Sequence, residues 1–162
     1  MKDKLLLTAF KGNYNSSKVL LDYITSSNCN KLLLTNSFTT CEKEITRAII
    51  KQKPKYILSF GQKPNTDKLN IETTACRNGI ILNTDFDVVS LEQSLKTSEI
   101  PYRLSNNAGN YLCNHVYFSG LYIIKQQALN TKMIFIHVPI MKDFSIIDIV
   151  SKWLNKHLEE LE

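Results

Sequence analysis

Short apolar runs alternate along this chain with longer segments in which apolar residues recur at helical spacing. The short runs are typical of buried parallel strands and lie at residues 4–9, 31–35, 56–60 and 133–138. Helical patterns cover residues 17–26, 39–52 and 113–130, and two more begin at Ser90 and near Ser145. Strands that alternate with helices predict a three-layer α/β/α fold built on a mainly parallel sheet, here as a single domain over residues 1–162.

Three of the helix starts carry a hydroxyl residue that is followed three positions later by an acid or an amide. The pairs are Thr39 with Glu42, Ser90 with Gln93, and Ser145 with Asp148. In a capping box the hydroxyl accepts a hydrogen bond from an amide of the first turn, and the later side chain reaches back to the capping residue. We therefore predict that Thr39, Ser90 and Ser145 cap these helices.

The environment of Glu72 can be interpreted in two ways from the sequence. Residues 69–76 alternate like a strand, and Glu72 falls on the face opposite Ile71, which in most such strands is the face toward water. Glu72 is therefore either a solvated carboxylate or a functional one.

His157, on the last helical segment, is predicted to be solvated. Gly61 is predicted to end the strand at residues 56–60.

Composition excludes several classes of protein. The chain has 162 residues, 43% of them hydrophobic, which is enough for one core. The net charge of +5 comes from scattered lysines rather than a dense basic block, so we expect no nucleic-acid partner. No apolar run approaches the roughly 20 residues of a membrane span. The four cysteines show no C-x-x-C spacing and no signal peptide precedes them, which predicts a cytoplasmic protein without a disulfide framework or metal site.

The loop at residues 105–112 leads into a helix whose first turn contains Cys113. Unpaired amide groups and the helix dipole favour a thiolate at such a position, although most intracellular cysteines are small buried apolar residues. Met133 to Pro139 reads as a buried strand that carries His137 near its end. A cysteine and a histidine at neighbouring element ends can form a nucleophile and its base. Cys41, which also lies near a helix start, has no such partner and is predicted to be structural.

Three blocks of this sequence resemble the pyroglutamyl peptidases, a family of cysteine exopeptidases. Residues 105–114 (Ser-Asn-Asn-Ala-Gly-Asn-Tyr-Leu-Cys-Asn) resemble the family's nucleophile loop, and residues 135–139 (Phe-Ile-His-Val-Pro) resemble its histidine strand. Gly61-Gln62, followed by Ile71-Glu72 and Ala75, resembles its Gly-Gln loop and glutamate strand. The blocks stand in the family's order and cover most of the chain from residue 56 to 139.

The resemblance implies a mixed sheet and a Cys-His-Glu triad that removes an N-terminal pyroglutamyl residue. Cys113 would be the nucleophile, His137 the base and Glu72 the residue that orients it, while Phe10 and Gln62 would contact the substrate. Neither a metal nor an organic cofactor is required. The expected partners are N-terminally blocked peptides, without nucleic acid or membrane. The family commonly forms homo-oligomers, which leaves a homo-oligomer open as an alternative to a monomer.

Two segments depart from the family pattern. The loop after Phe10 is shorter and lacks a second aromatic residue unless Tyr14 supplies it, and the segment between Glu72 and Cys113 lacks an Asp-Ala-Arg-Ile-Pro-Asp-Asn motif. Two alternatives therefore remain: a diverged, non-hydrolytic relative that binds or regulates, and a hydrolase that acts on another blocked N-terminus. An unrelated α/β domain that binds small molecules would require all three blocks to be coincidental.

Overall fold

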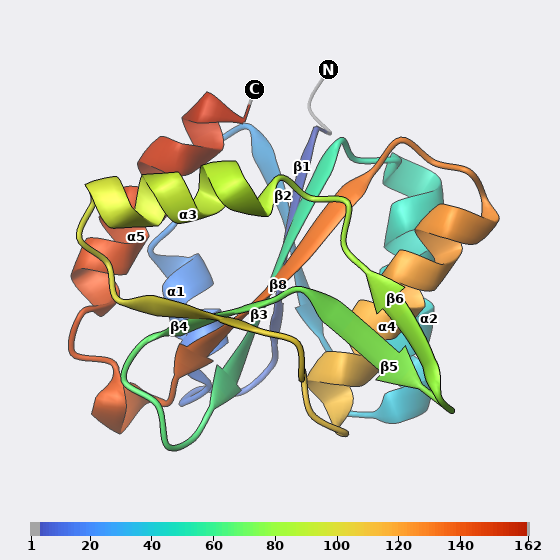
Figure 1. The fold of residues 1–162 in the computed structure, drawn as a ribbon, viewed down its shortest axis with the longest axis horizontal. Coiled ribbons are helices and arrows are strands. Elements are labelled where there is room, and N and C mark those ends of the chain that lie inside the picture. Colours follow the sequence, from blue (N-terminus) through green and yellow to red (C-terminus); the bar gives the residue numbers. More distant parts are fainter. Residues whose placement is uncertain (1–3, 162) are drawn as a thin grey trace.

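The computed structural model describes residues 4–161 and contains a central six-stranded sheet (Figure 1). Its strands, in the order β2-β1-β3-β8-β4-β7, are β2 (Cys29–Leu34), β1 (Leu5–Phe10), β3 (Tyr56–Lys63), β8 (Lys132–Pro139), β4 (Leu69–Glu72) and β7 (Tyr102–Ser105). The helices are α1 (Ser16–Asp22), α2 (Phe38–Gln52), α3 (Val88–Thr97), α4 (Leu112–Gln126) and α5 (Ile147–Glu160), with a short 3₁₀ turn, η1 (Met141–Asp143).

The sheet is mixed but mainly parallel, and helices cover both of its faces. β8 and β4 pair antiparallel, whereas β1 with β2, β1 with β3, β3 with β8, and β4 with β7 pair parallel. One apolar core unites the sheet with α1, α3 and α5, and a second unites it with α2 and α4, on the left and right of Figure 1. The three-layer α/β/α prediction is confirmed.

A separate hairpin replaces the single alternating strand predicted at residues 69–76. That strand divides at Thr73, where β4 ends in the main sheet and β5 (Thr74–Arg77) begins a two-stranded sheet with β6 (Ile80–Asn83) beside α4 (Figure 1). The turn uses Asn78 and Gly79 with φ of 50° and 78°, the positive angles that a tight hairpin turn requires. The alternation of residues 69–76 is real, but its two halves belong to different sheets.

Strand β3 also differs from the prediction, because it continues past Gly61. Gly61 pairs with His137, and the ladder continues to Lys63 opposite Pro139. A long parallel partner therefore keeps the strand extended through the glycine, and two polar residues, Gln62 and Lys63, become part of a sheet strand. This extension places the end of β3 beside the end of the histidine strand.

The predicted helix caps were wrong by a few residues. Ser37 caps α2 by accepting from the amide of Thr40 at 3.4 Å, and Asp87 caps α3 by accepting from the amide of Ser90 at 3.0 Å. Helix α5 begins after Ile146 without a side-chain cap. The predicted capping residues lie two positions beyond the true one for α2 and three beyond it for α3, because the serine or aspartate nearest the preceding loop reaches the free amides first.

His157 is buried rather than solvated. Its side chain is 6% exposed and stacks on Trp153, with ring centroids 5.1 Å apart and an interplanar angle of 17°. Burial lowers the pKa of His157, so the neutral ring is favoured there. Helix α5 packs its apolar face on the sheet, and its helical spacing brings His157 onto that face.

Within residues 4–161, no helix combines the length and apolar character needed to cross a membrane.

Candidate active site

Cys113 is the second residue of α4, and a structured loop carries the chain to it. After β7, the amide of Asn107 donates to the Ser105 hydroxyl at 3.2 Å, and the amide of Gly109 donates to the Asn107 side chain at 3.0 Å. Gly109 has a φ of 85°, a conformation that favours glycine. Tyr111 precedes the helix without a side-chain capping bond, so the first amides of α4 have no acceptor from the capping residue.

His137 and Glu72 form a buried pair between the two antiparallel strands of the sheet. The Nδ1 atom of His137 lies 2.8 Å from Oε1 of Glu72. Glu72 is fully buried, so the interpretation of Glu72 as a solvated carboxylate is wrong. The antiparallel register sets His137 opposite Asn70 and Phe135 opposite Glu72, so the two side chains meet diagonally across the ladder.

The carboxylate of Glu72 is poorly compensated apart from His137. Among residues 4–161 its Oε2 atom has no hydrogen-bond partner, although its backbone carbonyl accepts from the Tyr117 hydroxyl at 2.8 Å. A buried carboxylate whose partner is a single imidazole stabilises a positive charge on that ring. The pair is thus suited to hold His137 in one orientation and to stabilise its protonated form.

Cys113 and His137 line the same cavity, which has a volume of about 310 Å³. The walls come from the end of β3, the loop before α4, the start of α4 and β8. The lining residues are Gln62, Lys63, Pro64, Asn107, Ala108, Gly109, Asn110, Tyr111, Cys113 and His137. The arrangement can support nucleophilic attack by sulfur on an acyl group, with a histidine nearby to carry the proton.

The electrostatic environment of the thiol differs from the sequence prediction. Burial raises the pKa of Cys113 to about 12, and the charges of Glu72 and of a Cys41 thiolate would raise it in the same direction. The prediction that the helix start lowers this pKa is therefore wrong. Desolvation outweighs the helix-terminus effect, and a proton acceptor is needed to generate the thiolate at neutral pH.

Gly61 lies against the sulfur. A Cβ atom built at this position would lie 2.4 Å from Sγ of Cys113 and 2.9 Å from Cζ of Phe135. The cysteine can approach the sheet only because residue 61 has no side chain. The close approach explains why a glycine occupies the middle of an extended, buried strand.

Replacing Gly61 with alanine is therefore expected to displace Cys113 and to lower the rate of any reaction at its sulfur by about tenfold or more, since misplaced reacting atoms are costly. The reaction of Cys113 with iodoacetamide, followed by mass spectrometry, measures this directly. Val89→Ala is the control, because Val89 is exposed on α3 and lines no part of the cavity at Cys113. An unchanged alkylation rate in Gly61→Ala would contradict the steric explanation.

The structure places the two expected substrate contacts differently. Gln62 lines the cavity, and its Oε1 atom accepts from the amide of Ser16 at 3.0 Å, while its NH₂ group has no acceptor among residues 4–161. Phe10 does not line this cavity. It is 3% exposed and packs in the core between the sheet, α2 and α4.

Residues around the first turn of α4 hold the hairpin in place, which the sequence pattern did not predict. The Asn114 side chain accepts from the amide of Cys76 at 3.0 Å and donates to its carbonyl at 2.7 Å. Arg77 donates to the backbone carbonyl of His115 at 3.1 Å, and Nε2 of His115 lies 2.8 Å from Glu42. Only the adjacency of Asn114 and His115 to Cys113 could have suggested these roles.

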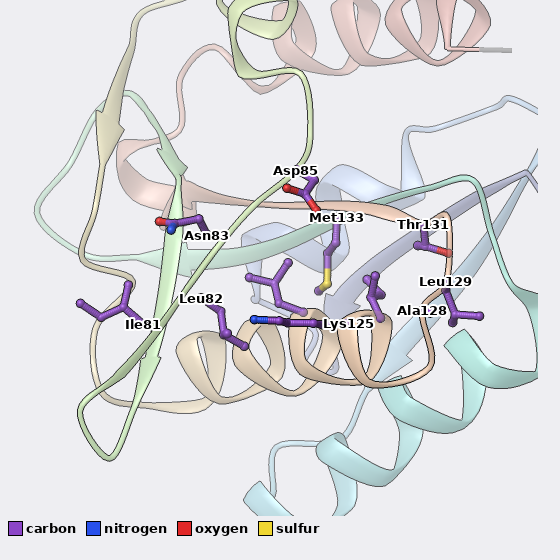
Figure 2. A pocket seen from close by; sticks show the side chains of 11 residues that line it. Ile81, Leu82, Asn83, Asp85, Lys125, Ala128, Leu129, Thr131 and Met133 are labelled. Atoms are coloured by element: carbon purple, nitrogen blue, oxygen red, sulfur yellow. The ribbon is translucent and has the colours of Figure 1, made fainter.

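A second cavity, of about 390 Å³, lies between β6, the C-terminal half of α4 and the start of β8 (Figure 2). Its lining is mainly apolar, with Ile81, Leu82, Leu129 and Met133 among its residues, and its charged side chains are Asp85 and Lys125. It contains neither a cysteine nor a histidine. This cavity therefore lacks the nucleophile and base that the cavity at Cys113 contains.

Comparisons with known proteins agree on one family. Residues 80–158 match the family model described as pyroglutamyl peptidase. The chain is 25% identical to the pyrrolidone-carboxylate peptidase of Thermosipho africanus, over 84% of this chain and 81% of that protein. It is 28% identical to the pyrrolidone-carboxylate peptidase of Clostridium botulinum, over 75% and 68% of the two chains.

The solved structures show the same fold. Pyrrolidone carboxyl peptidase from Thermococcus litoralis superposes with a TM-score of 0.81 and 21% identity, covering 99% of this chain and 96% of that one. Pyroglutamyl peptidase I from Bacillus amyloliquefaciens superposes with a TM-score of 0.83 and 19% identity, covering 94% and 93%. The shorter segment between Glu72 and Cys113 is thus compatible with the overall architecture.

Proposed function

We infer from these matches in sequence and in fold that the chain belongs to the pyroglutamyl peptidase family. On this premise, it is a cysteine exopeptidase that removes an N-terminal pyroglutamyl residue from peptides. The observation that carries the proposal is the shared cavity of Cys113 and His137, with Oε1 of Glu72 2.8 Å from Nδ1 of the histidine ring.

In the proposed reaction, the Cys113 sulfur attacks the carbonyl carbon of the pyroglutamyl peptide bond. His137 accepts the thiol proton as the carbon–sulfur bond forms, and it then donates this proton to the nitrogen of the leaving peptide as the carbon–nitrogen bond breaks. A water molecule, deprotonated by His137, attacks the thioester and releases pyroglutamate with restoration of the thiol. The raised pKa of Cys113 makes this transfer to His137 essential at neutral pH.

Glu72 and the start of α4 support the charges that develop. The Glu72 carboxylate accepts from His137, fixes its tautomer and stabilises the imidazolium that forms after proton transfer. Amide groups in the first turn of α4 have no acceptor within the helix and can stabilise the oxyanion on the scissile carbonyl. Both contributions grow as the reaction proceeds, which is the requirement for catalysis.

The cavity suits an uncharged acyl group. A pyroglutamyl residue has a lactam in place of a charged amine, so its pocket needs apolar walls and a few donors or acceptors. Pro64 and Ala108 supply apolar surface, and the free NH₂ group of Gln62 can donate to the lactam carbonyl. A substrate contact by Phe10 stays a prediction, since its ring lies in the core.

The proposal is tested by release of a fluorescent amine from pyroglutamyl and prolyl amides under reducing conditions. The prolyl amide is the matched control, because it has the same five-membered ring without the lactam carbonyl and with a charged nitrogen. We expect cleavage of the pyroglutamyl amide alone. Equal cleavage of both amides, or cleavage of neither, would contradict the assigned substrate.

The position of Phe10 favours one alternative, a hydrolase for another blocked N-terminus. Neither Phe10 nor Tyr14 lines the cavity, and Tyr14 is 88% exposed, so the aromatic residue in its wall is Tyr111, outside the expected loop. Acetylated and formylated peptides in the same assay would reveal this activity. A non-hydrolytic role, a homo-oligomer and a cytoplasmic location stay predictions.

A further inference from the structure

Lys63 extends from the sheet toward the nucleophile. Side chains alternate along a strand, so Lys63 leaves β3 on the same face as residue 61, where a Cβ would point at the Cys113 sulfur. Two residues of strand separate these positions by about 6.6 Å. The flexible side chain of Lys63 lines the cavity together with Cys113 and His137.

Lys63 is also the cavity's one permanently charged lining residue. The remaining lining residues are neutral except for His137, and none carries a carboxylate. Among residues 4–161, the Lys63 ammonium has neither an ion pair nor a hydrogen bond. By contrast, Lys11 at the end of the adjacent strand donates to the Thr35 hydroxyl at 3.0 Å.

An ammonium without a partner, partly enclosed in a cavity, favours a ligand that carries negative charge. Within the proposed function, on which this inference rests, the pyroglutamyl group is uncharged. The negative charge must therefore belong to the leaving part of the substrate. Since Lys63 is two strand residues from Gly61, which lies against the Cys113 sulfur, we expect the charge to be close to the scissile bond.

We propose that Lys63 determines specificity by favouring peptides that carry a carboxylate on the residue that follows the pyroglutamyl group. The carboxylate can be the side chain of an aspartate or glutamate, or the terminal carboxylate of a dipeptide. Lys63 binds this group and orients the leaving peptide, while Cys113 and His137 carry out the bond cleavage. Charge-assisted contacts of this kind are stronger than neutral ones.

The test compares matched peptide pairs with the native chain. One pair is pyroglutamyl-glutamate amide and pyroglutamyl-glutamine amide, which differ in charge but hardly in shape. The other is pyroglutamyl-alanine with a free or an amidated carboxyl terminus. We expect the charged member of at least one pair to have a kcat/KM about tenfold higher, and the pair that responds identifies the source of the carboxylate. The preference should weaken at high salt.

Substitutions then assign the preference to one residue. Lys63→Met is expected to abolish it, and Lys63→Glu is expected to reverse it in favour of pyroglutamyl-lysine amide. Lys142→Met is the matched control, because Lys142 follows β8 at the same edge of the sheet without lining this cavity. Circular dichroism confirms that each variant is folded.

Three outcomes would overturn the inference. Equal kcat/KM values within both pairs would show that the native site ignores the charge. A preference retained in Lys63→Met would assign it to another residue. In both of these cases, cleavage of the uncharged fluorogenic amide by the native chain would leave the proposed function standing. Absence of any pyroglutamyl cleavage by the native chain would remove the proposed function together with the role of Lys63.

Discussion

Replacing Cys113 with alanine is expected to reduce turnover of a pyroglutamyl amide to less than about one thousandth of the native rate, because no second cysteine and no serine or threonine lines the cavity with His137. The cysteine lies at the start of α4, and alanine is a good helix former, so the helix should persist. The measurement is amine release under reducing conditions, together with a thermal melt that checks the fold.

The control for this substitution is Cys76→Ala. Cys76 is an exposed cysteine on β5, and its backbone rather than its thiol contacts Asn114. This variant should keep native activity. Full activity in Cys113→Ala would remove both the nucleophile and the proposed mechanism, whereas loss of activity in both variants would point to a general effect of changing a thiol.

The second large effect is expected for His137→Ala, which should lower kcat by about 10²- to 10⁴-fold, the usual contribution of a general base. The same variant should alkylate more slowly at Cys113 near neutral pH. Burial raises the pKa of this thiol to about 12, so without an acceptor the thiolate forms only as the pH rises toward that value. The rate of Cys113 alkylation, measured between pH 6 and about 11 in both proteins, shows whether the variant requires a higher pH than the native chain.

Two further variants separate the roles around the histidine. Glu72→Gln retains the shape and one hydrogen-bonding oxygen but loses the charge that stabilises an imidazolium, so we expect kcat to fall with little change in KM. His157→Phe is the matched control, because His157 stacks on Trp153 and lines no part of the cavity at Cys113. A native pH profile of alkylation in His137→Ala would show that another group accepts the thiol proton.

The local sequence pattern located most secondary structure but not its ends. The β8 strand and the α2 helix were predicted to within a residue or two, because long apolar runs and helical periodicity depend on nearby residues alone. The ends depended on which side chain reached a free amide first, as at Ser37 and Asp87. The division of residues 69–76 depended on strand partners far away in the sequence.

The sequence by itself determined the α/β architecture and, through its resemblance to a family, indicated Cys113, His137 and Glu72 as candidate catalytic residues, because motif spacing and hydrophobic periodicity depend on nearby residues alone. Only the tertiary structure decided that Glu72 is buried against His137, that Gly61 makes room for the sulfur, and that Phe10 lies outside the cavity. It also reversed the expected direction of the Cys113 pKa, because desolvation and the Glu72 charge arise from segments that only folding brings together.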